Sequence, residues 1–191
     1  MQKIVIDIET KNEFKDVGSA EPTALDISLV GLYDSATSSY LSFLEKDFSK
    51  LWPILESADI LIGYNSDHFD IPLLNKYYHG NLKSIKSIDI LNEIRKSIGR
   101  RVKLDQVAEG TLGKKKSGHG LEAIRWWKTG EMEKIRQYCL EDVKLTKEIY
   151  DYALLNGELK FREGNKNIPI AMDTSRWETQ ELKNTTSSLP F

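Results

Sequence analysis

The chain contains only one cysteine, Cys139, among its 191 residues. A single thiol excludes an internal disulfide and a zinc site built from several cysteines, and it fits a reducing, cytoplasmic location. Apolar runs are short as well, since none approaches the roughly 20 residues that a bilayer span needs. The first nine residues include Asp7 and Glu9, so they do not resemble a signal peptide. We therefore expect a protein that does not enter a membrane.

An excess of positive charge is also lacking, because 27 Lys and Arg stand against 29 Asp and Glu. The distribution is uneven, however. Residues 76–128 hold thirteen basic and five acidic residues, and the rest of the chain holds fourteen basic and twenty-four acidic ones. This segment is either a cationic face suited to a polyanion or an ordinary solvated surface.

The length and the 40% hydrophobic content are typical of one soluble globular domain. We expect that domain to span residues 1–173, followed by a polar, flexible tail at 174–191.

Three expected strands are followed by alternating helices and strands, which indicates an α/β fold with a mixed central sheet flanked by helices. The expected strands are 2–9, 28–33, 39–44, 59–64 and 84–87. The expected helices are 49–57 (with Pro53 close to its first turn), 72–78, 90–98, 104–112, 121–128 and 131–155. Residues 159–161 and 168–172 are expected to form a C-terminal β-hairpin around Gly164 and Asn165.

Two carboxylates share one face of the first expected strand. Asp7 and Glu9 are two residues apart, so both point away from the face that carries Ile6 and Ile8. Two like charges on a central strand need a compensating cation, such as a divalent metal ion.

A second group of polar residues follows the fourth expected strand. Asn65, Phe69 and Asp70 form an Asn-x3-Phe-Asp pattern where a strand gives way to a helix, a location that favours ligand sites in α/β sheets. Asp70 could instead cap the helix, and Phe69 could simply pack in the core. His68 is expected at the surface.

The long helix expected near the end of the chain carries a third group. Tyr138 and Asp142 are four residues apart, so the phenol and the carboxylate lie on one helical face. A carboxylate in line with apolar residues is either paired or coordinating.

Taken in order, Asp7-x-Glu9, Asn65-x3-Phe69-Asp70 and Tyr138-x3-Asp142 resemble the three motifs of the DEDD superfamily of 3'-5' exonucleases. Because Tyr138 lies four residues before Asp142, the sequence resembles the tyrosine branch of this superfamily, called DEDDy. More narrowly, residues 1–173 look like stand-alone exonucleases related to the proofreading domain of family B DNA polymerases. The resemblance implies a ribonuclease H-like fold and a 3'-5' exonuclease that acts on single-stranded or frayed DNA or RNA, with DNA favoured.

The same resemblance implies two Mg²⁺ or Mn²⁺ ions held by four acids. Asp7 would bridge both ions, Glu9 and Asp142 would complete one, and Asp70 would reach the other. Tyr138 would orient the attacking water, and the reaction would be a two-metal-ion displacement at phosphorus. Asn65 would position the site or the terminal nucleotide.

Several further interpretations stay open. Lys114, Lys115 and Lys116 could contact phosphates or form a solvated loop. Trp126 and Trp127 are neighbours on an expected helix and diverge by about 100°, so at most one can be a core residue. The other could stack on a base, although its partial burial is expected. The apolar end of the tail could dock a replication or repair partner.

Two alternative functions also remain. One is a structure-specific endonuclease of the same fold, because a metal site does not reveal whether a strand end is required. The other is a non-catalytic nucleic-acid-binding module that keeps the fold.

Overall fold

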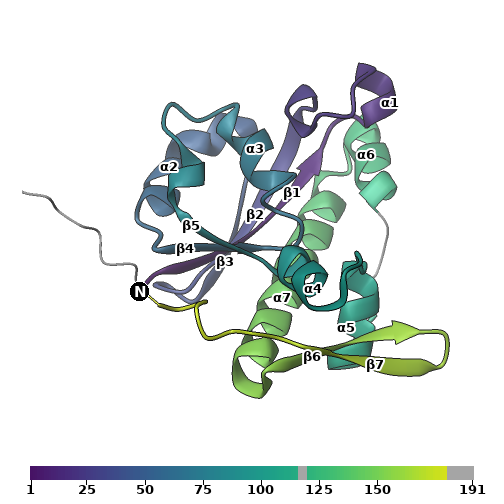
Figure 1. Ribbon diagram of the computed structural model, residues 1–191. Coiled ribbons are helices and arrows are strands. Elements are labelled where there is room, and N and C mark those ends of the chain that lie inside the picture. Colours follow the sequence, from purple (N-terminus) through teal and green to yellow (C-terminus); the bar gives the residue numbers. More distant parts are fainter. Residues whose placement is uncertain (116–119, 180–191) are drawn as a thin grey trace, which may run out of the picture.

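The computed structural model describes residues 1–115 and 120–179 and has a five-stranded central sheet, whose arrangement can be followed in Figure 1. The strand order is β3-β2-β1-β4-β5, with β1 antiparallel to β2 and parallel to β4. The strands are β1 (Lys3–Thr10), β2 (Ile27–Asp34), β3 (Ser39–Phe43), β4 (Ile60–Gly63) and β5 (Lys86–Asp89). The predicted mixed sheet is confirmed, although β5 begins two residues later than expected.

The central strand β1 separates two hydrophobic cores. Ile4, Ile6 and Ile8 pack into the core beneath helices α2 (Phe48–Glu56) and α3 (Asp70–Asn75). Val5 belongs to the other core, which the long helix α7 (Met132–Asn156) covers. Because side chains alternate along a strand, Asp7 and Glu9 share the α7 side with Val5.

The remaining helices are α1 (Phe14–Val17), α4 (Ile90–Ile98), α5 (Leu104–Leu112) and α6 (Gly120–Thr129). The predicted limits of α4 and α5 are correct, because Gly99 and Gly113 end them in the left-handed conformation that glycine adopts without strain. Helix α3 begins at Asp70, two residues before the expected start at Pro72. Pro53 is the sixth residue of α2, so its predicted place near the first turn is wrong.

The predicted C-terminal hairpin is confirmed as β6 (Glu158–Glu163) and β7 (Lys166–Ala171). It packs closely on α5, because a Cβ on Gly110 would lie 2.6 Å from the Cα of Phe161. Beyond the hairpin, Trp177 is buried and stacks on Tyr150 of α7 with ring centroids 5.3 Å apart. Packed structure therefore continues past residue 173, whereas residues 180–191 lie outside the described part of the chain.

Within residues 1–115 and 120–179, no helix is both long enough and apolar enough to cross a membrane.

Candidate active site

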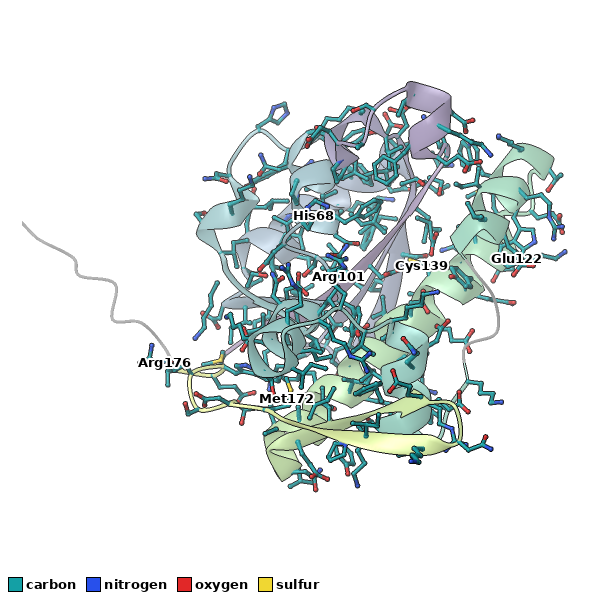
Figure 2. All side chains as sticks on the ribbon, turned by 45° about the vertical axis from the view of Figure 1, so that its right-hand side comes forward. His68, Arg101, Glu122, Cys139, Met172 and Arg176 are labelled. Atoms are coloured by element: carbon teal, nitrogen blue, oxygen red, sulfur yellow. The ribbon has the colours of Figure 1, made fainter. Side chains whose placement is uncertain are left out.

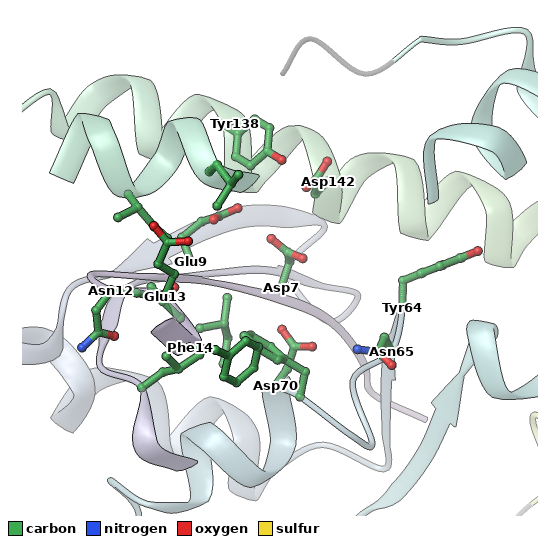
Figure 3. Close-up of a pocket in the computed structure, with 16 residues that line it drawn as sticks. Asp7, Glu9, Asn12, Glu13, Phe14, Tyr64, Asn65, Asp70, Tyr138 and Asp142 are labelled. Atoms are coloured by element: carbon green, nitrogen blue, oxygen red, sulfur yellow. Dashed lines mark hydrogen bonds between the residues drawn. The ribbon is translucent and has the colours of Figure 1, made fainter. Parts of the chain in front are cut away.

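A cleft of about 450 Å³ brings together the acids and the tyrosine singled out in the sequence (Figure 3). Asp7 and Glu9 reach it from β1, Asp70 from the start of α3, and Tyr138 and Asp142 from α7. Asn65 and Phe69 line it as well. Seven of the predicted site residues, separated by up to 135 positions in sequence, thus share one cavity.

The topology of the sheet explains this convergence. Strands β1, β4 and β5 are parallel, so their carboxyl ends meet at one edge, where α/β proteins place ligands. Asn65 and Asp70 come after β4 and therefore arrive at that edge. On α7, the four-residue spacing turns Tyr138 and Asp142 toward β1.

Helix α7 approaches the sheet closely at this point because β2 carries a glycine there. Gly31 pairs with Asp7 across the antiparallel strands. A Cβ on Gly31 would lie 2.7 Å from Sγ of Cys139, so a larger residue would push the helix outward. The absence of a side chain at Gly31 therefore helps to bring Asp142 next to Asp7.

Most of these carboxylates are withdrawn from water. Glu9, Asp70 and Asp142 are 8%, 5% and 4% exposed, respectively. Burial and then the neighbouring charge of Asp7 raise the pKa of Asp70 well above its ordinary value. Such a group of buried like charges is costly unless positive charge compensates it.

The donor set fits hard divalent cations, which prefer oxygen ligands. Ligand atoms of Asp7, Glu9 and Cys139 lie within 4.8 Å of one another. Cys139 is unsuited to such an ion, because burial raises the pKa of its thiol and the thiol donates to the backbone oxygen of Asp7 at 3.4 Å. The carboxylates, rather than the thiol, form the acidic cluster.

The segment between β4 and α3 places the second predicted motif. Asn65 has a positive φ of 68°, which is uncommon for a residue with a side chain. Phe69 meets Phe14 of α1 edge to face at 6.2 Å and belongs to the core below, so it both packs and lines the cleft. His68 is exposed, as expected (Figure 2).

Tyr138 has its ring fixed by a neighbouring helix. The side chain is 3% exposed, and its ring meets Trp126 of α6 at a centroid distance of 5.9 Å. Trp126 and Trp127 are both partly buried, and Nζ of Lys11 lies 5.2 Å from the Trp127 ring centroid. Trp126 therefore supports Tyr138. Both tryptophans are partly buried, so the expectation that at most one belongs to the core holds, and stacking of either on a base stays a prediction.

Lys114 and Lys115 are not among the described residues that line the cleft. Lys114 pairs with Glu148 of α7 at 2.5 Å, and Lys115 lies 3.7 Å from Glu109 of α5. Lys116 lies outside the described residues. A role for these lysines in substrate binding stays a prediction.

Sequence reasoning missed part of the cleft wall. Phe14 and Leu121 line its mouth and are 39% and 66% exposed. Their contribution depends on how α1 and α6 pack around β1, and no motif marks either residue. The other lining residues not predicted are Ile8, Thr10, Asn12, Glu13, Leu25, Tyr64 and Ile124.

Comparisons with known proteins agree with this architecture. The RNase_H_2 family model, described as RNase_H superfamily, matches residues 4–154. A DNA polymerase from Thermococcus aggregans is 31% identical over an alignment that covers 49% of this chain and 7% of the polymerase. The structure of the family B DNA polymerase from the hyperthermophilic archaeon Pyrobaculum calidifontis matches with a TM-score of 0.60 and 17% identity. That match covers 81% of this chain and 24% of the polymerase, so this chain spans a minor part of either relative.

Proposed function

The chain belongs to the RNase_H superfamily, and from this membership and the acidic cleft we propose that it is a metal-dependent 3'-5' exonuclease. Its substrate is the 3' end of single-stranded or frayed nucleic acid, with DNA favoured because the similar proteins are DNA polymerases. The observation that carries the proposal is the convergence of Asp7, Glu9, Asp70 and Asp142 with Tyr138 in one cleft.

The four carboxylates would hold two divalent cations, Mg²⁺ or Mn²⁺. When bound, such ions activate water and neutralise charge on the phosphate. The protein's own groups then orient the reactants. The Tyr138 hydroxyl, whose ring is fixed against Trp126, orients the attacking water by hydrogen bonding, and Asn65 faces the terminal nucleotide.

The walls of the cleft suit a flexible strand of any sequence. Phe14 and Leu121 offer exposed apolar surface on opposite elements at its mouth, where bases can pack without being read by hydrogen bonds. A cleft of this size accepts a strand end more readily than a stacked duplex, since the bases of a duplex are not free to enter.

The direct test is cleavage of 5'-labelled single-stranded DNA and matching RNA with Mg²⁺, Mn²⁺ or EDTA. We expect a metal-dependent ladder that shortens from the 3' end. Asp7→Asn should reduce the rate by at least about 100-fold, because removing one member of a catalytic group costs that much or more. Asp151→Asn is the matched control, because Asp151 pairs with Lys147 on α7 and does not line the cleft.

A circular single-stranded substrate separates the exonuclease from an endonuclease of the same fold. The circle should remain intact while the linear strand is degraded. If the wild-type protein cuts the circle and the Asp7→Asn variant does not, the protein is an endonuclease. Strand binding without metal-dependent cleavage of any substrate would favour a non-catalytic module.

A further inference from the structure

The backbone of Asn65 is held in place without help from its side chain. Its N–H donates to Oδ1 of Asp89 at 2.8 Å, and the N–H of Asp67 donates to Oδ2 of Asp89 at 3.2 Å. Asp89 is 2% exposed and also caps α4, so it is a firm anchor. These bonds stabilise the left-handed backbone at Asn65 and present its side chain to the cleft.

A second residue fixes the orientation of that side chain. Arg101, in the segment between α4 and α5, donates from a guanidinium nitrogen to Oδ1 of Asn65 at 2.8 Å (Figure 2). A guanidinium has donors only, so the amide oxygen must face it and the amide nitrogen must face the other way. Figure 3 shows that nitrogen turned toward Asp7 and Asp70.

The amide nitrogen places a hydrogen-bond donor on a wall that is otherwise rich in acids. Asp7, Glu9, Glu13, Asp70 and Asp142 all line the same cavity. An amide reversed by 180° would add one more oxygen to that wall and repel the oxygens of a nucleotide. Control of the amide orientation therefore decides whether Asn65 attracts or repels a strand end.

We propose that Arg101 is a substrate-positioning residue that acts through Asn65. It holds the amide so that Nδ2 donates to an oxygen acceptor of the terminal nucleotide, either a phosphate oxygen or the 3' hydroxyl. This inference rests on the proposed exonuclease function, and it adds a residue that no motif contains.

The neighbouring arginine provides a matched control. Arg100 pairs with Glu163 at 2.8 Å and lies over the Phe161 ring, facing the hairpin instead of the cleft. Arg101→Ala and Arg100→Ala remove the same charge one residue apart. Arg101→Ala should raise KM about tenfold with little change in kcat, as expected for loss of one hydrogen bond that helps to bind the substrate. Arg100→Ala should change KM less than about twofold.

Two further variants separate positioning from plain electrostatics. In an Asn65→Ala background, Arg101→Ala should have no additional effect on KM, because its partner is absent. Arg101→Lys keeps the charge and N–H donors but loses the planar guanidinium, so it should retain part of the affinity that Arg101→Ala loses. The fold should survive all of these changes, since the Tyr64 hydroxyl still donates to the backbone oxygen of Val102 at 2.7 Å.

Equal effects of Arg100→Ala and Arg101→Ala, or additive effects of Arg101→Ala and Asn65→Ala, would overturn the inference. A strand lacking its 3' hydroxyl identifies the acceptor. If Arg101→Ala no longer raises KM on that strand, the acceptor is the 3' hydroxyl. If the rise in KM persists, the acceptor is a phosphate oxygen. If no hydrolysis is found, the same variants are compared by their affinity for labelled DNA, measured by fluorescence anisotropy with Ca²⁺. The proposed role of Arg101 and the proposed exonuclease function can therefore fail separately.

Discussion

Asp70 illustrates at the residue scale how a proposed binding site opposes stability. The side chain is buried, and both burial and Asp7 raise the pKa of its carboxyl group. A raised pKa in the folded state means that folding favours the protonated form. Without a cation, the stability linked to Asp70 is therefore present at low pH and lost as the pH rises through the raised pKa.

We predict that Asp70→Asn raises the stability of the metal-free protein at about pH 7, because the neutral amide avoids the cost of burying a charge beside Asp7. The gain should shrink as the pH falls through the raised pKa toward the ordinary pKa of an aspartate, because Asp70 of the folded wild-type protein then becomes neutral. Thermal unfolding in EDTA across this range measures both effects. With Mg²⁺ the order should reverse, since the cation stabilises only a protein that binds it well.

Asp26→Asn is a control for which we expect the opposite change in stability. The hydrogen bond from Lys76 lowers the pKa of Asp26, so its contribution is present above the ordinary pKa and lost as the pH falls. This substitution should lower stability slightly at neutral pH. Destabilisation by both variants in EDTA would contradict the account of Asp70.

Predicting single site residues from sequence depends on local spacing. Asp7, Glu9, Tyr138 and Asp142 lie on regular elements whose periodicity fixes the side that each faces. Arg101 and Asp89 lack such a pattern, because they reach the loop that holds Asn65 only through long-range packing.

At the scale of elements, the contact between β2 and α7 sets the width of the cleft. Gly31 allows the Cys139 side chain to sit against β2, directly across from Asp7. The position of α7 in turn determines where Tyr138 and Asp142 lie in the cleft. Function at this site thus depends on a glycine that does not line it.

Gly31→Ala should lower stability by about 1–3 kcal/mol, because the new methyl group overpacks the interface. Activity should fall about tenfold or more, because outward movement of α7 misplaces Asp142. Urea unfolding and the single-strand cleavage rate measure the two effects.

Cys139→Ala provides the compensating change for Gly31→Ala. It removes the atom that would clash, although Val143 Cγ2 remains 3.3 Å from the new Cβ. The double variant should lose less unfolding free energy than the two single variants lose together, and part of the activity should return. A strictly additive double variant would show that this contact does not set the position of α7.

The elements also show where sequence patterns are sufficient. Gly99 marked the end of α4 correctly, the loop that begins at Gly113 marked the end of α5, and alternation indicated β1. Helix α1 has only four residues and contains no buried residue, so periodicity provides no signal for it. Its place above the cleft follows from contacts with distant segments, as the Phe14–Phe69 pair shows.

At the scale of the whole molecule, the segment after the hairpin returns to the sheet. Trp177 stacks on Tyr150, and Glu178 accepts from the Tyr150 hydroxyl at 3.0 Å and from Nζ of Lys3 at 2.6 Å. The expected domain limit at residue 173 came from the polarity of the tail and the extent of the resemblance, neither of which reveals that a tryptophan within a polar stretch is buried.

Trp177→Ala should reduce the free energy of unfolding by about 3 kcal/mol, as large-to-small changes in cores do. Trp177→Phe should cost much less, because it keeps the ring and removes an indole N–H that has no hydrogen-bond partner among the described residues. Leu155→Ala is the control, with a side chain 85% exposed and an expected change within about 0.5 kcal/mol. Urea unfolding of the three variants tests this order, and equal costs for Trp177→Ala and Leu155→Ala would rule out a packing role.

The ion pair between Lys3 and Glu178 places the first strand and the last packed segment side by side. A folded unit whose entry and exit points adjoin can be spliced into a surface loop of a host polypeptide without stretching that host. The same geometry permits circular permutation, with a short linker joining the two ends and new ends opened at an exposed turn such as Gly164. The adjoining ends of this packed unit, more than the ion pair itself, would allow larger proteins to carry it.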